Sequence, residues 1–348
     1  MPAGISEVEP ASVAGLSADE LDEASSGDGV EGDEPHIAEV REFVLAPGHH
    51  GQRIDKVLAD LVPEFSRSYL QQLLALGAVQ YHGVSATKAS AKVRAGEVVR
   101  LEMRPTLQSQ AFRPESLPLD VVYEDEHLLI INKAAGMVVH PAPGNWSGTL
   151  LNALLARHSG ASLVPRAGIV HRLDKDTSGL MVVARTRSTM DALVGMIARR
   201  EVSRQYLALA ERPWRGALER TVQAPIGRDP RNRLRMAVVD LASHAGKPAR
   251  TDFRCLATAS QGCLVHCTLH TGRTHQIRVH MASLGHPLVA DVLYGGQPVP
   301  ALDRQGLHAY RLAFDHPVTH QPLLFQMDLP GDMSRALLDW GLGYNPAP

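Results

Sequence analysis

The sequence predicts an α+β protein in which a small N-terminal domain of helices and short strands precedes a larger domain of mixed α+β character. Three observations support this prediction. Hydrophobic residues make up 44% of the 348 residues, which suffices for the cores of roughly two domains of about 150 residues each. Between residues 51 and 101, two helical repeats precede short alternating segments. From residue 119 onwards, apolar runs typical of strands are interspersed with a few helical repeats.

The formal charge of -2 is the sum over two parts of the chain that differ in charge. Residues 1–40 contain eleven acidic residues and no Lys or Arg, so the remaining 308 residues hold 35 basic and 26 acidic groups, a net charge of +9. Such a split favours contact with nucleic acid or a membrane surface. Residues 1–42 are poor in apolar residues, which predicts an acidic disordered tail. This tail is either a solvated extension or an arm that competes with nucleic acid for the basic surface.

Several classes of protein are excluded by composition. No apolar run approaches the ~18 residues of a membrane span, and the N-terminus lacks the basic and apolar regions of a secretory signal. Three cysteines, Cys255, Cys263 and Cys267, are too few for a disulfide framework in a chain of this length. We therefore expect a cytoplasmic protein that does not contact membranes.

The elements of the first domain follow from local patterns over residues 43–103. Its first helix is predicted by an i, i+3, i+4, i+7 repeat of apolar residues that ends near Pro63: Ile54, Val57, Leu58 and Leu61. Its second helix is predicted by a leucine stripe between a candidate N-cap and a glycine: Ser66, Leu70, Leu73, Leu74 and Gly77. Val79 and Tyr81 alternate with polar neighbours before a His82-Gly83 turn, and residues 93–101 indicate closing strands.

The second domain is predicted over residues 119–340, after a proline-containing linker at residues 104–118. Its strands are indicated by five apolar segments: VVYEDEHLLIINK, GLMVVART, QYLALA, GCLVHCTLH and LLFQMDLP. Helical patterns lie at about residues 149–157 and 188–200. We find no internal repeat of fixed period, so a solenoid is not predicted.

The densest polar segment is GIVHRLDKDTSG at residues 168–179, directly before a strand. It combines two carboxylates, two cations, a histidine and two hydroxyl groups. A loop at the entrance to a strand is a common place for an active site, because the rigid strand positions its side chains. Clusters of Asp, Thr, Ser and Gly also form ordinary turns, so this segment alone leaves both interpretations open.

A second polar segment, LHTGRTHQIRVHM, occupies residues 269–281. Its arginines are able to pair bidentately with a carboxylate or a phosphate. Ile277 and Val279 alternate with Arg278 and His280, which predicts that the apolar side chains are fixed in the core while the polar ones point the other way. A basic surface helix or strand is the alternative.

Together these segments resemble known families. GQRIDKVLADLVPEFSRSYLQQLLALGAVQYHG, followed by VRAGEVVRLE, resembles an S4 domain, a small RNA-binding module. Four further segments resemble the motifs of the RluA/RluD family of pseudouridine synthases, in the same order: INKAAGMVVHPAPG, GIVHRLDKDTSGLMVVART, VSRQYLALA and TGRTHQIRVHMASLGHPLVADVLYG. One departure is Ala134, where the family usually has proline. The resemblance implies an S4-like RNA-binding domain followed by a catalytic domain built on a mixed, mostly antiparallel sheet flanked by helices.

The reaction of this family constrains the catalytic group. Turning uridine into pseudouridine breaks the N1–C1′ bond and joins C5 to C1′, with no redox change and no added atom. One carboxylate is enough, because it can attack C1′ or take a sugar proton to form a glycal. The resemblance implies that Asp174 is this carboxylate. Asp176 lies two residues further on and would share its face in an extended loop, so spacing alone does not choose between them.

The resemblance also implies roles for other residues. Arg278 is expected to pair with Asp174 and hold it ionised. Tyr206 is expected to pack against the target uracil and assist proton transfer at C5, although a lone strand tyrosine otherwise indicates core packing. Arg172 is expected to fill the space that a flipped-out uridine leaves. Further residues are expected to wall the pocket, position the loops or contact RNA: Ile277, His171, Thr177, Arg273, His275, Gln276 and, on the second helix of the S4-like domain, Arg67.

The sequence therefore predicts a cofactor-free, monomeric RNA pseudouridine synthase, an isomerase that acts on specific uridines in a stem-loop of large-subunit (23S) ribosomal RNA. The pre-ribosomal large subunit is a further candidate partner. A tRNA-directed or dual-specificity enzyme is one alternative. Others are a non-catalytic RNA-binding factor for ribosome assembly and a metal-dependent hydrolase that uses His171, Asp174 and Asp176.

A zinc site is not expected near the cysteines. Cys263 and Cys267 alternate onto one face of a predicted strand, while His266 and His270 fall on the other. The sequence thus predicts no metal site, and it predicts buried structural thiols instead.

Overall fold

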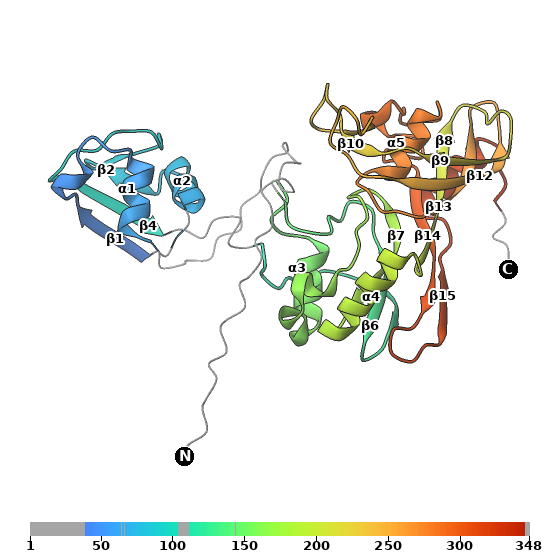
Figure 1. Cartoon of the computed structure of the whole chain (residues 1–348), viewed down its shortest axis with the longest axis horizontal. Coiled ribbons are helices and arrows are strands. Elements are labelled where there is room, and N and C mark those ends of the chain that lie inside the picture. The colour runs from blue at the N-terminus through green and yellow to red at the C-terminus, as the bar shows by residue number, and fades with distance from the viewer. Residues whose placement is uncertain (1–38, 64, 66, 104–110, 143, 345–348) are drawn as a thin grey trace, which may run out of the picture.

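Figure 1 shows the computed structural model of the chain, in which a small N-terminal unit precedes a larger one. The structure describes residues 39–63, 65, 67–103, 111–142 and 144–344. The predicted acidic tail lies outside the described residues as far as residue 38, as do residues 104–110 of the predicted linker and the candidate N-cap Ser66. None of the described helices has the length and apolar character of a membrane span.

The N-terminal domain packs two helices against a four-stranded antiparallel sheet. In chain order its elements are β1 (Glu39–Val44), a 3-10 helix (Pro47–His49), α1 (Ile54–Leu61), α2 (Arg67–Ala75), β2 (Val79–Tyr81), β3 (Val84–Ser85) and β4 (Val98–Met103), and the strand order is β1-β4-β2-β3. The predicted apolar stripes of both helices form its core. Gly77 has a φ of 68° beyond α2, and His82 and Gly83 have φ values of 56° and 71° between β2 and β3, as a two-residue hairpin turn of this type requires.

Two predictions for this domain need correction. Residues 39–42 were assigned to the disordered tail, but they form most of β1, which pairs with β4 from Glu39 opposite Met103 to Val44 opposite Val98. The backbone pairing and the packing of Phe43 on the core hold this strand despite its exposed charges. A strand was also predicted near Val93. That residue is buried in the core, but its segment is a loop with a single bridge between Arg53 and Lys92.

A buried carboxylate joins the two helices of this domain. Asp55 on α1 is fully buried and accepts hydrogen bonds from Arg53, Arg67 and Gln71, at 3.0, 2.8 and 2.8 Å for the shortest contact of each. Burial alone would raise the pKa of Asp55, but these donors hold it well below its usual value. The Arg67 side chain is half exposed. Its guanidinium thus connects α2 to α1, and its contact with RNA stays a prediction.

The larger domain is built on a nine-stranded sheet. Its strands are β5 (Asp120–Glu124), β6 (Leu128–Lys133), β7 (Ser178–Ala184), β8 (Ser203–Glu211), β9 (Glu219–Gln223), β12 (Arg250–Thr258), β13 (Gly262–Leu269), β14 (Leu307–Asp315) and β15 (Pro322–Gln326). Their order is β5-β6-β7-β14-β8-β13-β12-β9, with β15 paired to β14. The β7–β14 pair is parallel, whereas the other pairs are antiparallel. The predicted α+β class with a mixed, mostly antiparallel sheet is confirmed.

Helices cover both faces of this sheet (Figure 1). They are α3 (Leu150–Arg157), α4 (Arg187–Arg199), α5 (Gln276–Ser283) and α6 (Gly331–Asp339), and a small hairpin of β10 (Ile226–Arg228) and β11 (Met236–Val238) lies apart from the main sheet. Leu129 and Ile131 of β6 pack in the core that contains α3 residues, whereas Leu128 and Ile130 pack in the one that contains α4 residues. Because successive strand residues face opposite ways, burial on both faces explains the continuous apolar run of β6.

The parallel pair at the centre of the sheet contains a buried histidine. Ser178 Oγ and His308 Nδ1 lie 2.9 Å apart, and His308 is 2% exposed. Burial, together with the charge of Arg304, lowers the pKa of His308 to about 4. The unfolded chain takes up a proton near pH 6.5. The contribution of neutral His308 to the free energy of unfolding is therefore complete above pH 6.5 and is lost as the pH falls from there towards 4.

From this we expect His308 alone to lower the free energy of unfolding by about 2 kcal/mol at about pH 5 relative to about pH 7.5. Urea unfolding at both pH values measures the difference. His308→Gln should remove a similar part of the pH dependence, because glutamine does not titrate. His50 is exposed, so His50→Gln serves as the control and should leave the pH dependence as it is. An unchanged pH dependence in His308→Gln would contradict the prediction.

Candidate active site

The polar segment before β7 forms a tight loop that presents Asp174. Leu173 is 5% exposed and anchors the loop in the core. The Thr177 N–H donates to the Asp174 carbonyl at 3.1 Å and closes the turn. Arg172 is exposed on one side of Asp174, and the Asp174 side chain is 17% exposed. The local sequence thus buries the leucine and leaves the neighbouring carboxylate at the surface of the site.

Two cations from distant segments hold the backbone of this loop. Lys133, at the end of β6, is 2% exposed, and its Nζ donates to the carbonyls of Ala134, Met137 and Lys175 at 2.7, 2.9 and 2.9 Å. Burial lowers the pKa of Lys133 to about 7, and only its ammonium form has three hydrogens for three acceptors. Arg304 donates to the Asp176 carbonyl at 2.9 Å and forms a bidentate pair with Asp332.

Helix α5 supplies the cation that faces Asp174. Arg278 is 7% exposed, and its Nη1 donates to Asp174 Oδ2 at 3.0 Å. Its Nε and Nη2 donate to the two oxygens of Asp291 at 2.7 and 2.9 Å. The guanidinium also lies over the ring of Tyr294, 5.0 Å from the ring centre. The planar guanidinium of Arg278 therefore bridges the carboxylates of Asp174 and Asp291, and its two hydrogen bonds to Asp291 fix its orientation.

The charges around Asp174 keep it ionised. Burial would raise its pKa, but the charges of His275, Arg278 and Arg172 and the hydrogen bond from Arg278 lower it below its usual value. His275 Nε2 lies 4.0 Å from Asp174 Oδ1, while its Nδ1 lies 2.8 Å from the Tyr294 hydroxyl. Burial opposes the charge on Arg278, yet Asp291 and Asp174 raise its pKa. At neutral pH the site holds a carboxylate beside a guanidinium.

Tyr206 lies at the boundary between the core and this site. It is 5% exposed on β8 and packs in the same core cluster as Ile277 and Met281 of α5. Burial raises the pKa of Tyr206 to about 12, and the negative charge of Asp174 adds to this effect while Arg204 opposes it. The tyrosine is therefore neutral near Asp174, with a hydroxyl hydrogen available for donation.

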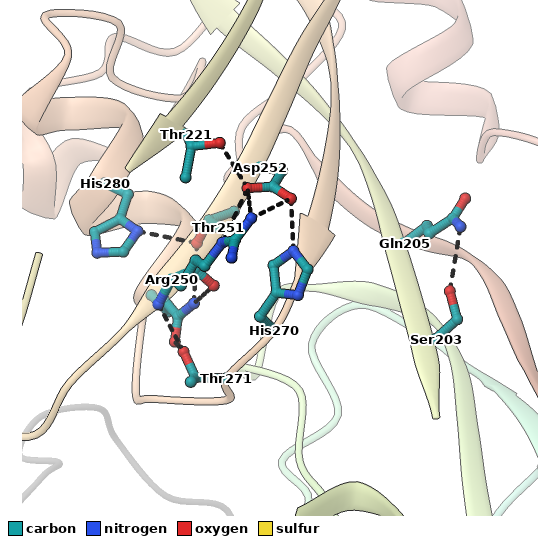
Figure 2. A network of polar contacts seen from close by, with 10 residues as sticks. Ser203, Gln205, Thr221, Arg250, Thr251, Asp252, His270, Thr271 and His280 are labelled. Carbon is teal, nitrogen blue, oxygen red and sulfur yellow. Dashed lines mark hydrogen bonds and ion pairs between the residues drawn. The ribbon is translucent and has the colours of Figure 1, made fainter. Parts of the chain in front are cut away.

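A network of polar contacts braces the loop before α5. Figure 2 shows the part of it that includes Arg250, Thr251, Thr271 and His280. Gln276 Oε1 accepts from the Thr271 hydroxyl and the Arg273 N–H at 2.7 and 3.0 Å, and its Nε2 donates to the Arg250 carbonyl and Thr251 Oγ1 at 3.0 and 2.9 Å. Thr251 Oγ1 lies 2.9 Å from His280 Nδ1. These contacts connect Gln276 to the loop and to β12, and its contact with RNA stays a prediction.

The predicted division of α5 into an apolar and a polar side is wrong. Residues 276–281 form a helical turn and a half in which Arg278 and His280 are as buried as Ile277 and Val279. The polar side chains tolerate burial because each finds a partner. Arg278 binds two carboxylates, and His280 Nε2 lies 3.0 Å from the Ala224 carbonyl.

The structure brings most of the predicted site residues together. Asp174, Arg278, His275 and Tyr206 form one cluster, with Arg172 near enough to affect the pKa of Asp174. His171 Nε2 accepts from the Val182 N–H at 3.1 Å, and buried Thr177 accepts from Gln305 at 3.2 Å, so both hold the loop. Arg273 donates to the Pro248 carbonyl at 3.1 Å. Arg67 belongs to the N-terminal domain.

Four residues of the site were not singled out from the sequence. Asp291 and Tyr294 lie in the segment VADVLYG and Lys133 in INKAAGM, both within quoted motifs, while Arg304 lies outside them. For Asp291, Tyr294 and Lys133 the available signal was their place in a motif, but no local pattern shows that Asp291 pairs with Arg278. Among the described residues no group of three metal-ligating side chains is gathered. Cys263 and Cys267 are fully buried, whereas His266 contacts Gln205 and His270 contacts Asp252 (Figure 2 shows His270 beside Asp252).

The fold and the site together define a class of two-domain α+β proteins in which the larger domain pairs a carboxylate with a buried arginine. Comparisons with known families narrow this class. Residues 52–99 match the S4 domain, and residues 127–283 match the family described as RNA pseudouridylate synthase. The chain belongs to the RNA pseudouridylate synthase family, which confirms the predicted resemblance.

Curated relatives are similar over most of the chain. The ribosomal large subunit pseudouridine synthase D of Nitrosomonas europaea is 48% identical over 297 residues, which cover 82% of this chain and 84% of that protein. The proteins of the same name from Neisseria meningitidis serogroup A and Escherichia coli are 46% and 43% identical and cover 82% and 81% of this chain, and 78% and 89% of their own. The solved structure of human RNA pseudouridylate synthase domain containing 4 covers 65% of this chain and 94% of its own, with 22% identity and a TM-score of 0.52, which supports the fold.

Proposed function

We propose that this protein converts specific uridines of large-subunit (23S) ribosomal RNA into pseudouridine, with Asp174 as the catalytic carboxylate. The observation that carries the proposal is the pair of Asp174 and Arg278 at 3.0 Å, in which the arginine is fixed from behind by Asp291. Relatives at 43–48% identity that are named ribosomal large subunit pseudouridine synthase D support ribosomal RNA as the substrate.

The chemistry requires an ionised carboxylate at the anomeric carbon. Asp174 either attacks C1′ or takes a sugar proton while the N1–C1′ bond breaks, and the free uracil then turns so that C5 joins C1′. In the last step C5 loses its proton and N1, which left C1′ with the electron pair of the broken bond, takes one up. On the glycal route Asp174 returns its proton to the sugar. Arg278 keeps Asp174 charged and aimed. Tyr206, neutral and buried against the core, supplies a flat ring for the uracil and a hydroxyl for proton transfer at C5.

The uridine must leave its stem-loop before C1′ is accessible to Asp174. Arg172 is exposed two residues before Asp174, and this position supports a role in which its planar cation fills the vacated space. Arg273, His275 and Ile277 complete the proposed site. The net charge of +9 outside the first 40 residues attracts phosphate at long range, and the S4 domain adds a second contact with RNA. We place the reaction in the cytoplasm, with a monomer acting on ribosomal RNA or on the pre-ribosomal large subunit.

Pseudouridine mapping tests this proposal. Ribosomal RNA and tRNA are compared from cells with and without the gene, and the purified protein is incubated with large-subunit RNA and with tRNA that carry tritium at C5 of uridine. Loss of large-subunit pseudouridines on deletion and tritium release from that RNA are expected. Release from tRNA alone would instead support the tRNA-directed alternative. RNA binding without release from either RNA would support a non-catalytic assembly factor.

A further inference from the structure

Strand β8 contains a buried arginine, Arg204, that forms no ion pair with any residue that the structure describes. Two arginines of the described residues are buried, Arg204 and Arg278, each 7% exposed. Arg278 binds two carboxylates. Arg204, in contrast, forms no ion pair with the described residues, and its Nε is enclosed without a hydrogen-bond partner. The two buried guanidinium groups of the domain therefore differ in what balances their charge.

An unbalanced buried cation destabilises a folded protein. A buried donor without an acceptor is unfavourable, and a buried charge without a partner is more so. Proteins retain such groups mainly where they act, because a ligand later supplies the missing partner. The position of Arg204 thus favours a bound anion that the described part of the chain does not supply.

The surroundings of Arg204 place it in the proposed active site. It precedes Tyr206 by two residues on one strand, so the two side chains share a face and lie roughly 7 Å apart along it. Arg204 pairs with Leu269 of β13, directly before the loop of residues 270–275. A Cβ atom on Gly272 of that loop would lie 3.1 Å from Arg204 Nη1. A side chain at position 272 would therefore crowd the Arg204 guanidinium.

A second donor without an acceptor lies near Arg204. His171 Nε2 accepts from the Val182 N–H, so in the neutral ring Nδ1 carries the hydrogen. Nδ1 is enclosed and has no hydrogen-bond partner among the described residues. Burial lowers the pKa of His171 to about 3, and the charge of Arg204 contributes to that shift. The loop that carries Asp174 and the loop of residues 270–275 thus enclose a region with an excess of hydrogen-bond donors and of positive charge.

We propose that Arg204 binds a phosphate that flanks the target uridine and so positions its ribose against Asp174. The inference rests on the proposed function, because it needs RNA in this site. A phosphodiester supplies the charge and the acceptor oxygens that Arg204 lacks, and guanidinium groups bind phosphate with two hydrogen bonds. If the uracil packs against Tyr206, strand β8 would contact the base through Tyr206 and the phosphate through Arg204.

A combined variant and substrate experiment tests this contact. Arg204→Gln removes the charge from the protein, and a methylphosphonate placed 5′ or 3′ of the target uridine removes it from one phosphate. Each single change is expected to lower kcat/KM by about 10- to 100-fold. At the contacted phosphate, the two changes together should lower it no more than Arg204→Gln alone. Effects that multiply at both phosphates would overturn the proposal.

Controls separate this inference from folding and from the proposed function. Arg254 on neighbouring β12 is exposed, and in Arg254→Gln the two methylphosphonate effects should equal those of the unchanged protein. Gly272→Ala keeps Arg204 but crowds its Nη1, and it should also weaken the dependence on the contacted phosphate. If Arg204→Gln does not fold, the same cycle with Gly272→Ala decides, and multiplying effects there overturn the proposal. Absence of pseudouridine formation by the unchanged protein would instead refute the proposed function.

Discussion

Replacing Asp174 by asparagine is expected to lower the rate of pseudouridine formation by at least about 10³-fold, with RNA affinity changed by less than about threefold. Asparagine fills nearly the same volume, but it neither attacks C1′ nor takes a proton from the sugar. Arg278 keeps its two hydrogen bonds to Asp291, so the loop and α5 should stay in place. Single-turnover release of tritium from C5 of uridine measures the rate, and filter binding measures the affinity.

Asp176→Asn is the matched control, since it makes the same chemical change two residues away. Arg304 holds Asp176 by its carbonyl and not by its carboxylate, so this variant should retain most of the activity. Full activity of Asp174→Asn, or its loss only in Asp176→Asn, would show that the catalytic carboxylate is misassigned.

Replacing Arg278 by methionine is expected to have the second largest effect. The change leaves Asp174 and Asp291 without their shared cation, and the Asp291 side chain is only 1% exposed. Removing one partner of a buried ion pair lowers the free energy of unfolding by about 3–5 kcal/mol. Loss of the electrostatic support should also lower the rate by about 10²- to 10³-fold. Urea unfolding and single-turnover kinetics measure the two effects.

The pH dependence of Arg278→Met gives a sharper test. Arg278 is one of the groups that lower the pKa of Asp174, whereas burial raises it. Without Arg278 the pKa of Asp174 should rise, and residual activity should fall off at a higher pH than in the unchanged protein. Arg187→Met removes an exposed pair with Asp191 and should change the unfolding free energy by less than about 1 kcal/mol. If the activity of Arg278→Met fell off at the same acidic pH as that of the unchanged protein, the role of Arg278 in lowering the pKa of Asp174 would be contradicted.

Much of the fold could be predicted because its signals are local. The apolar repeat of α1 and the leucine stripe of α2 lie within single helices, and the glycine at position 77 marks the end of one. Strands β6, β7, β8 and β13 were indicated by runs of a few residues. The error at α5 arose because a short alternation of polar and apolar residues fits a strand, whereas the helix tolerates polar residues that find buried partners elsewhere.

The sequence by itself determined the domain types, the order of the motifs and the identity of the candidate carboxylate. Only the tertiary structure decided how the buried charges are balanced. Arg278 meets Asp291 and Asp174, which lie 13 and 104 positions away in the chain, and Lys133 reaches the carbonyl of Lys175 from 42 positions away. Arg204, in contrast, forms no ion pair within the described part of the chain. The physical reason is that a periodic pattern reports which side of an element is buried, whereas the partner of a buried charge depends on which distant segments the fold brings into contact.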